Sequence, residues 1–273
     1  MKTRSISLLV GLFCGGVCLA QPSNQSGIAH VAFRVADLDA ARTFYNKLGF
    51  EQFFEVKQGN RITQAFLKIN DRQFIELYPR TGASEPLGLM HICYESSDIE
   101  ALHAELQQRG AAVSNVRKAG AGNLLMTMKD PEGQTIEYTQ YMPGSRHFED
   151  RGKHLGAERV AQVIVGATAP ARDAEAMRNF YVGKLGFSRI GESGSVRLRM
   201  PGSSGQVLDL PPEGPGVRSG ICFGVADLER THQILVRLGL TVTATPSMLA
   251  VTDPDGVALM FVKSAPPNSA ARD

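Results

Sequence analysis

The sequence predicts an α+β protein made of four βαβββ modules, each with one strand, one helix and three further strands. The first observation is a duplication, because residues 43–50 recur as residues 179–187, about half a chain later. The second is a shared turn, since Asp130-Pro131-Glu132-Gly133 has its counterpart in Asp253-Pro254-Asp255-Gly256. The third is that each half divides again into two units in which a strand pattern precedes a helix pattern.

Composition limits the classes of protein to which this chain can belong. Its 273 residues are 43% hydrophobic and 21% charged, which excludes a disordered, collagen-like or coiled-coil protein. Lysine and arginine number 29 against 27 for aspartate and glutamate, and there is no basic run. Neither nucleic acid nor an anionic membrane is therefore an expected partner. The length suits two domains, each with a core of its own.

The first module is expected in residues 27–78. Residues 27–35 alternate in the manner of a strand, and residues 38–48 show helical spacing that Gly49 ends. Two strands, residues 64–69 and 73–78, follow around a turn at Asn70-Asp71.

The second module repeats this order and completes the first half. A strand at residues 89–95 leads to a helix that opens with the capping box Ser97-Asp98-Ile99-Glu100 and ends at Arg109-Gly110. Strands 124–128 and 134–141 are joined by the Asp-Pro-Glu-Gly turn. The halves are assigned to residues 27–145 and 159–265. Residues 146–158 are expected to be a linker with solvated His147 and His154, and residues 266–273 a frayed tail.

Four side chains occupy matched positions in the first two modules. His30 and His91 fall in the opening strands, while Glu76 and Glu137 fall in later strands. The apolar neighbours of each glutamate have the opposite parity, so the carboxylates are expected to face inward, away from the helices. Alone, each histidine is better explained as a core residue and each glutamate as a rim residue. Their paired occurrence favours one common site.

Two imidazoles and two carboxylates in one cavity need a cation among them. Nitrogen and oxygen donors suit one divalent ion, namely Zn, Ni, Mn, Co or Fe, and the donor set does not distinguish these metals. Four ligands leave room for substrate oxygens, which allows Lewis-acid chemistry.

The second half provides an internal comparison. Aligned on the shared motifs, its residues at the four ligand positions are Gln162, Asp209, Gly220 and Met260. Glycine and methionine cannot replace histidine and glutamate at such a site. The second half is therefore expected to be a structural partner without a metal. The alternative is a second, metal-free binding cavity.

Further residues share the inward parity and are candidates for the substrate pocket. Arg34 follows His30, Tyr78 follows Glu76, and Thr139 follows Glu137 at the same parity. Cys93 shares the parity of His91. Cys93 and Cys222 are expected to face separate interiors, so no disulfide between them is predicted.

The N-terminus has the pattern of a signal peptide, assigned to residues 1–20. A cationic start is followed by 15 apolar residues, numbers 6–20, and by Cys18-Leu19-Ala20, which suits signal peptidase. Cleavage would leave a periplasmic or secreted protein that is not held in a membrane. Lipidation is the alternative, but Phe13 and Val17 stand where lipoproteins usually carry a small residue.

With these motifs in place, the chain resembles the vicinal oxygen chelate superfamily. That superfamily includes glyoxalase I, bleomycin- and fosfomycin-resistance proteins, methylmalonyl-CoA epimerase and extradiol dioxygenases. The resemblance rests on Phe44-Tyr45-x-Lys47-Leu48-Gly49-Phe50, on Asp130-Pro131-x-Gly133, and on the metal set His30, Glu76, His91 and Glu137. It implies that the four modules pair into two glyoxalase-like, eight-stranded open barrels, with one divalent ion bound by the first barrel.

The same resemblance implies an activity and two alternatives. The His-Glu-His-Glu set is similar to that of bacterial glyoxalase I, which implies lyase or isomerase chemistry on a small oxygen-chelating substrate. Glu137 would then be the general base, and Glu76 a ligand or second base. An Fe(II) extradiol dioxygenase and a metal-dependent binding or resistance protein are the alternatives. Dioxygenases of the superfamily usually carry their metal in the C-terminal half, opposite to this chain. The oligomeric state stays open.

Overall fold

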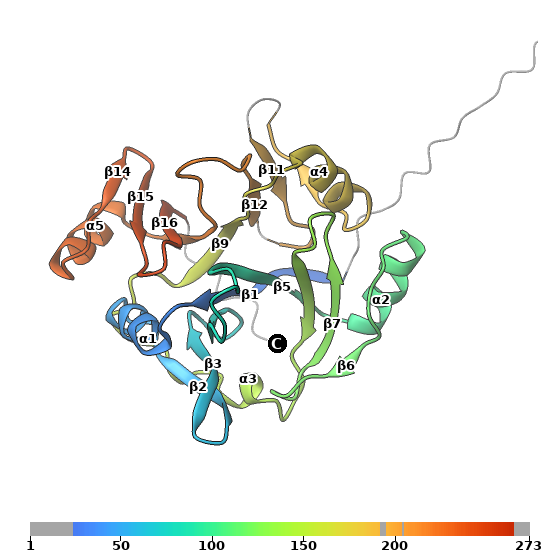
Figure 1. Ribbon diagram of the computed structural model, residues 1–273, viewed down its shortest axis with the longest axis horizontal. Helices are drawn as coiled ribbons and strands as arrows, with labels where there is room; N and C mark the ends of the chain where they lie inside the picture. Colours follow the sequence, from blue (N-terminus) through green and yellow to red (C-terminus); the bar gives the residue numbers. More distant parts are fainter. Residues whose placement is uncertain (1–23, 192–194, 204, 265–273) are drawn as a thin grey trace, which may run out of the picture.

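The computed structural model describes residues 24–191, 195–203 and 205–264. The expected signal segment, residues 1–20, and the expected tail, residues 266–273, lie outside the described residues. The fold is α+β, with two mixed sheets of eight strands each (Figure 1). Among the helices of the described residues, none is long and apolar enough to cross a bilayer.

The first sheet has the order β2-β3-β4-β1-β5-β8-β7-β6 and curls into a cup that is open on one side. Two modules contribute four strands each, and their opening strands, β1 and β5, pair antiparallel at the centre. The strands are β1 (Gln25–Val35), β2 (Gln52–Gln58), β3 (Arg61–Lys68), β4 (Phe74–Pro79), β5 (Gly88–Ser96), β6 (Arg117–Lys118), β7 (Leu124–Lys129) and β8 (Thr135–Gln140).

Two helices cover the outer side of this cup. The helix α1 (Leu38–Lys47) begins at Asp37, whose carboxylate accepts hydrogen bonds from two backbone N–H groups of the first turn. The helix α2 (Ile99–Gln108) is capped by Asp98, not by the Ser97 of the expected capping box. Both helices match the predicted segments within two residues. The two strands that the sequence did not indicate are β2 and the two-residue β6.

The second sheet repeats the first in the order β10-β11-β12-β9-β13-β16-β15-β14. Its helices are α4 (Ala174–Gly183) and α5 (Leu228–Arg237). The strands are β9 (Val163–Thr168), β10 (Ser188–Arg189), β11 (Val196–Arg199), β12 (Val207–Leu210), β13 (Gly220–Val225), β14 (Thr243–Thr245), β15 (Met248–Thr252) and β16 (Ala258–Lys263).

Strand register relates the halves residue by residue and corrects one sequence alignment. His30 lies opposite Phe74 and Cys93 in the first sheet, and Gly166 lies opposite Val207 and Cys222 in the second. The counterpart of His30 is therefore Gly166. The expected counterpart, Gln162, is exposed and precedes β9. The alignment had failed because β9 has no histidine or other marked residue to fix its register.

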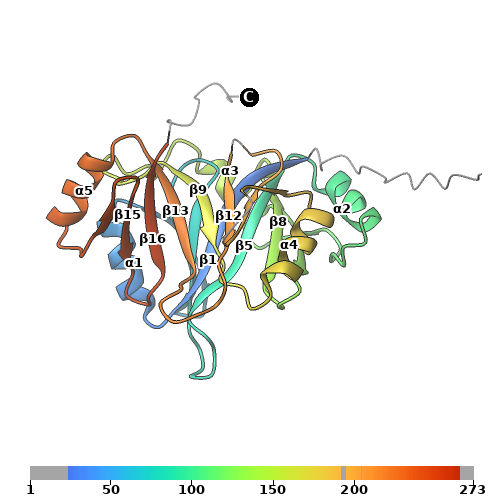
Figure 2. The same ribbon diagram turned by 90° about the horizontal axis from the view of Figure 1, so that it is seen from above.

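The halves share one continuous hydrophobic core instead of having one each. Phe50 and Phe223 contact across the join with ring centroids 5.3 Å apart, and Tyr94 and Phe187 do so at 5.6 Å. The helix α1 lies beside the last strands of the second half, and its Tyr45 hydroxyl donates to Asp253 Oδ2 at 3.0 Å. Figure 2 shows the two sheets side by side with helices at both ends. The halves therefore pack as one unit.

Residues 146–158 are not a solvated linker throughout. They include α3 (Arg146–Glu149), which lies at the open side of the first cup. Lys68 on β3 is buried and places its ammonium 2.8 Å from Asp150 Oδ2 and 2.9 Å from Asp71 Oδ1. His154 pairs with the other oxygen of Asp150 at 2.6 Å. Because these charges compensate one another, the segment forms a fixed wall of the cup.

Candidate metal centre

The sheet brings the four predicted metal ligands together on the concave face of the first cup. His30 comes from β1 at the centre, Glu76 from the parallel strand β4, and His91 from the antiparallel strand β5. Ala32 is the register partner of both Glu76 and His91. Its methyl group is on the same face as His30, so only a small side chain stands between the three donors. Glu137 reaches the group from β8, beside β5.

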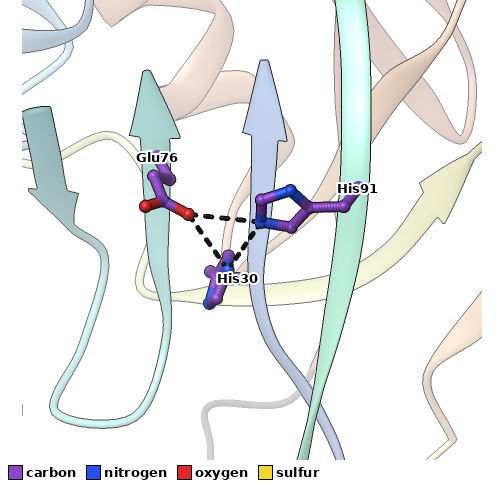
Figure 3. A group of neighbouring side chains, drawn as sticks. All are labelled: His30, Glu76 and His91. Carbon is purple, nitrogen blue, oxygen red and sulfur yellow. Dashed lines mark hydrogen bonds and ion pairs between the residues drawn. The ribbon is translucent and has the colours of Figure 1, made fainter. Parts of the chain in front are cut away.

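The donor atoms meet within a few ångströms (Figure 3). His30 Nε2 lies 3.0 Å from His91 Nε2 and 3.2 Å from Glu76 Oε2. His91 Nε2 lies 3.2 Å from Glu76 Oε2. The carboxylate of Glu137 is slightly farther, with Oε2 at 3.7 Å from His30 Nε2 and 3.5 Å from His91 Nε2.

These separations suit one cation. Metal–nitrogen and metal–oxygen bonds of about 2.1 Å place tetrahedral ligand atoms about 3.4 Å apart, and adjacent octahedral ones about 3.0 Å apart. The observed donor–donor distances of 3.0 to 3.7 Å cover both values. Imidazole nitrogen and carboxylate oxygen are donors that Zn, Mn, Fe, Co and Ni all accept. The residues present therefore fit a divalent ion.

Burial and charge separate the two glutamates. The side chain of Glu76 is 7% exposed, and its Oε1 accepts a hydrogen bond of 2.9 Å from Tyr78. Burial alone would raise the pKa of Glu76, but hydrogen bonds from His30 and His91 outweigh it and lower that pKa. Burial lowers the pKa of His91, yet the hydrogen bond to Glu76 and the charge of Glu137 raise it overall. The side chain of Glu137 is 16% exposed and faces the open cavity.

His30, Glu76 and Glu137 line a cavity of about 310 Å³ inside the cup. One wall is apolar, from Phe66, Phe74, Leu125 and Tyr141. Gln64, Asn123 and Arg117 add polar groups. The volume lies at the lower end of ligand pockets, which span roughly 300–1,000 Å³. This cavity is therefore sized for a small molecule.

The other sequence candidates occupy different places. Tyr78 and Thr139 line the cavity, and the Thr139 hydroxyl donates to Leu124 O. Cys93 is fully buried and lies within 4.8 Å of donor atoms of His30 and Glu137. Arg34 does not line the cavity, because its guanidinium turns to the loop before β5, where Nη1 donates to Pro86 O at 3.1 Å. Both cysteines of the described residues are free.

The cavity also contains His147, which the sequence predicted to be a solvated linker residue. It comes from α3, is buried, and lies against Phe74 with ring centroids 4.6 Å apart. Met142 N–H donates to Asn123 Oδ1, so the Asn123 amide nitrogen donates to His147 Nδ1 at 2.8 Å. Burial lowers the pKa of His147 to about 3. The imidazole is therefore neutral, with its proton on Nε2.

The second half has an ion pair at one of the positions equivalent to the ligands. Asp209 occupies the position of Glu76, and its Oδ1 lies 3.0 Å from Arg197 Nε. Arg197 is the register partner of Asp209, as Phe66 is of Glu76. The other ligand positions hold Gly166, Gly220 and Met260. A guanidinium thus balances the remaining carboxylate.

A larger hollow of about 620 Å³ lies where the halves meet, but its residues give no comparable site. It is lined mainly by loop and turn residues, including Asp130, Glu132, Arg172 and Glu213. Glu132 is already engaged, with Oε2 at 3.5 Å from Arg172 Nε and Oε1 accepting from Asp173 N. We therefore assign function to the smaller cavity, where the donor groups converge.

Comparison with protein-family models identifies the superfamily to which the chain belongs. The model of the Glyoxalase/Bleomycin resistance protein/Dioxygenase superfamily matches residues 27–138 and again residues 163–261. The chain belongs to this superfamily. Both halves match, although only the first carries the donor set. Solved structures that carry glyoxalase and dioxygenase names share the architecture over about nine-tenths of the chain.

Three relatives illustrate the range of this glyoxalase superfamily. The ethylmalonyl-CoA/methylmalonyl-CoA epimerase of Cereibacter sphaeroides is 34% identical over 128 residues, which cover 41% of this chain and 95% of that protein. The Mn(II)-bound glyoxalase of Novosphingobium aromaticivorans superposes with a TM-score of 0.69 at 16% identity, covering 89% of this chain and 83% of that one. A catechol 2,3-dioxygenase superposes with a TM-score of 0.68 at 16% identity, covering 92% of both chains.

Proposed function

We propose that the protein is a divalent-metal-dependent enzyme that moves a proton on a carbon beside a carbonyl group. Its substrate would be a small molecule with two adjacent oxygens that chelate the ion. The observation that supports this most is the convergence of His30, Glu76, His91 and Glu137, in which one carboxylate is anchored and the other open. An anchored ligand and an open carboxylate are what metal-assisted proton transfer requires.

The roles of the residues follow from their surroundings. His30, His91 and Glu76 would hold the ion, and Tyr78 fixes the Glu76 carboxylate by hydrogen bonding. The ion supplies Lewis-acid polarisation of a bound carbonyl, which makes the neighbouring C–H more acidic. Glu137 Oε2 lies at the cavity surface and would accept that proton and return it. Phe66, Phe74 and Leu125 exclude water from the reacting carbon.

The charge of the lining constrains the substrate. Two ligand carboxylates balance a divalent ion, and His147 is neutral above its lowered pKa of about 3. Arg117 is the only lysine or arginine among the cavity residues and makes no ion pair with the described residues. The loaded cavity therefore carries one net positive charge, which favours a compact anion with an apolar body.

Two relatives support the choice of proton transfer. The name of the epimerase from Cereibacter sphaeroides describes inversion at a carbon next to a thioester carbonyl. The Mn(II)-bound glyoxalase shares the fold over most of both chains. We also propose that residues 1–20 direct export. An exported enzyme meets little of the cytosolic thiol pool, so a free substrate suits it better than a glutathione adduct.

Extradiol cleavage by Fe(II) is the second candidate, because the catechol 2,3-dioxygenase likeness extends over 92% of both chains. His30, His91 and one glutamate would form the facial triad that such chemistry uses. The second glutamate within reach of the same point favours proton transfer instead. A metal-dependent binding or resistance protein remains the non-enzymatic alternative.

One purification with three measurements tests these candidates. The protein is isolated from the periplasm, and its metal content is determined. Oxygen uptake is followed with catechol, and solvent deuterium incorporation is followed with small free 2-oxo carboxylates such as 2-oxobutyrate. Zn, Ni, Mn or Co with deuterium incorporation supports the proposal, and Glu137→Gln should abolish incorporation while keeping the metal. Iron with oxygen uptake overturns it in favour of the dioxygenase. Metal-free protein at every loading condition overturns both enzyme assignments.

A further inference from the structure

We propose that Cys93 gives this centre a second set of ligands, His30, Cys93 and Glu137, which captures thiophilic cations such as Cd²⁺. The inference rests on the proposed metal function and deepens it, because it concerns which ions the site accepts. The two sets share His30 and Glu137. They differ in that a thiol replaces Glu76 and His91.

Strand register places the thiol between two ligands. Cys93 follows His91 by two residues on β5 and so faces the same side of the sheet. It is the direct partner of His30 on β1 and of Glu137 on β8. Donor atoms of the three side chains all lie within 4.8 Å of one another. The thiol is therefore part of the polar group and not an isolated core residue.

The Cys93 thiol lies deeper in the protein than the ligands that line the cavity. Cys93 is fully buried and is not among the residues that line the cavity. The polar contact of its Sγ within the described residues is a long one, 3.8 Å to Tyr94 O. A carboxylate oxygen of Glu137 lies within 4.8 Å of this thiol. The negative charge of that carboxylate would favour a cation at this depth.

The shared imidazole is free to serve either set. Ligating histidines usually donate their second ring nitrogen to a carboxylate or carbonyl, which fixes the ring. His30 Nδ1 is buried and has no hydrogen-bond partner among the described residues. The ring is held instead by stacking on Phe74, with centroids 4.4 Å apart. Stacking restrains rotation about the Cβ–Cγ bond but allows a small change in χ1 to slide the ring over Phe74.

The two ligand sets should prefer different metal ions, because one contains a thiolate and the other does not. Thiolate prefers Zn²⁺ and Cd²⁺, whereas Mn²⁺ prefers carboxylate and water. Tetrahedral Zn²⁺ bonds of about 2.3 Å to sulfur and about 2.1 Å to nitrogen place those atoms about 3.6 Å apart. Because the donor atoms lie within 4.8 Å of one another, a side-chain shift of about 1 Å at most brings them to this spacing, and the thiol proton leaves to the solvent on binding. A thiophilic ion held this way would occupy His30 and Glu137 and so withhold the base from substrate.

The second half offers a matched control for the thiol itself. Cys222 has the same register position, opposite Gly166 on β9 and Met260 on β16. Neither partner can replace His30 or Glu137 as a nitrogen or oxygen ligand. If a cysteine at this strand position were enough for binding, both thiols would respond to a metal.

Metal titration of the full mature chain tests the proposal. Co²⁺ and Cd²⁺ are added to the wild type and to Cys93→Ser, Cys93→Ala and Cys222→Ser while ultraviolet sulfur-to-metal charge transfer is recorded. The wild type and Cys222→Ser should show the band, and both Cys93 variants should lack it. Affinity for Cd²⁺ should fall roughly tenfold or more in the Cys93 variants, the size of effect that loss of a supporting group causes. Affinity for Mn²⁺ should stay within about twofold.

The outcomes separate this proposal from the proposed function. Binding of one Mn²⁺ per chain without a thiolate band for Cd²⁺ overturns the role of Cys93 and leaves the enzyme proposal intact. A band that disappears equally in Cys222→Ser also overturns it. Failure of the wild type to bind either ion overturns both proposals. Because serine and alanine variants are compared, a folding defect in one does not decide the result.

Discussion

The side-chain amide of Gln73 pairs with both backbone groups of Ile164, as a neighbouring strand would. Gln73 Oε1 accepts from Ile164 N–H at 2.8 Å, and Nε2 donates to Ile164 O at 3.0 Å. The same Nε2 donates to Ile28 O at 3.1 Å. Gln73 precedes β4 in the first half, and Ile164 belongs to β9 in the second. One buried amide thus joins the opening strands of both halves.

Replacing Gln73 by alanine should destabilise the whole chain. The change leaves backbone groups of Ile164 buried without partners, at about 1–3 kcal/mol for each group. We expect the free energy of unfolding to fall by about 2 kcal/mol or more in urea denaturation. Gln64→Ala is the control, because Gln64 lines the cavity on β3. Equal losses in the two variants would show that the bridge contributes nothing specific.

Bound metal should stabilise the protein through the predicted ligands. An ion at about one hundred times its Kd adds about 2.7 kcal/mol to the free energy of unfolding. We expect EDTA to lower the Tm of the loaded wild type, and His91→Ala to abolish both the metal and this response. His103→Gln on α2 should keep both. Retention of one metal per chain by His91→Ala would contradict the ligand set.

The pH dependence of stability should carry a contribution from His147. Its folded pKa is lowered to about 3, so the neutral imidazole is favoured in the folded state. The stabilisation is therefore complete above the unfolded value of about 6.5 and is lost as the pH falls towards 3. Between pH 7 and pH 5 the wild type should lose about 2 kcal/mol more than His147→Gln.

Urea unfolding at pH 7 and pH 5 measures this effect. The free energy of unfolding is compared between the wild type and the variant, so that the contributions of the other titrating groups cancel. His232→Gln on α5 is the control and should follow the wild type. An equal fall in His147→Gln and the wild type would mean that the imidazole is not held neutral by burial.

Processing of the N-terminus can be checked by mass. If residues 1–20 are a cleaved signal, the mature protein begins at Gln21. Expression in a Gram-negative host should then give periplasmic protein whose intact mass lacks those residues. Ala20→Lys should block or shift the cleavage. A lipid-modified mass, with Cys18 as the first residue, would favour the lipoprotein alternative.

The four modules and the four candidate ligands could be predicted from the sequence, because both depend on the local periodicity of side chains. Parity along a strand decides which face Glu76 and Glu137 occupy, and their neighbours Ile136 and Tyr138 are buried in the core as expected. The duplication made the paired positions visible without any structure. The strand at residues 52–58 escaped because Phe53 and Phe54 interrupt its alternation.

What the sequence could not indicate depends on distant contacts. His147 is buried because Lys68, 82 residues before Asp150, holds the segment against the cup. Nothing local in residues 146–158 distinguishes such a wall from a solvated linker. The absence of a separate core in each half has the same origin, since Phe50 and Phe223 belong to different halves.

The backbone of the second half, as well as its side chains, leaves no room for an equivalent donor set. A Cβ at Gly166 would lie 2.7 Å from Val207 O, and one at Gly220 would overlap Ala258 O. The strands next to both glycines have thus approached more closely than a side chain allows. Gly220→Ala should cost about 1–3 kcal/mol in the free energy of unfolding, as overpacking does. Gly183→Ala, where nothing lies within 4 Å, should be neutral or slightly stabilising.

Because the strands leave no room for the larger side chains, supplying the missing ligands should not create a second metal site. The fourfold variant Gly166→His, Asp209→Glu, Gly220→His and Met260→Glu should bind no second metal ion. Titration with Mn²⁺ should still give one ion per chain. A stoichiometry of two would show that the second half lacks only the ligand side chains and that the spacing of its strands does not prevent metal binding.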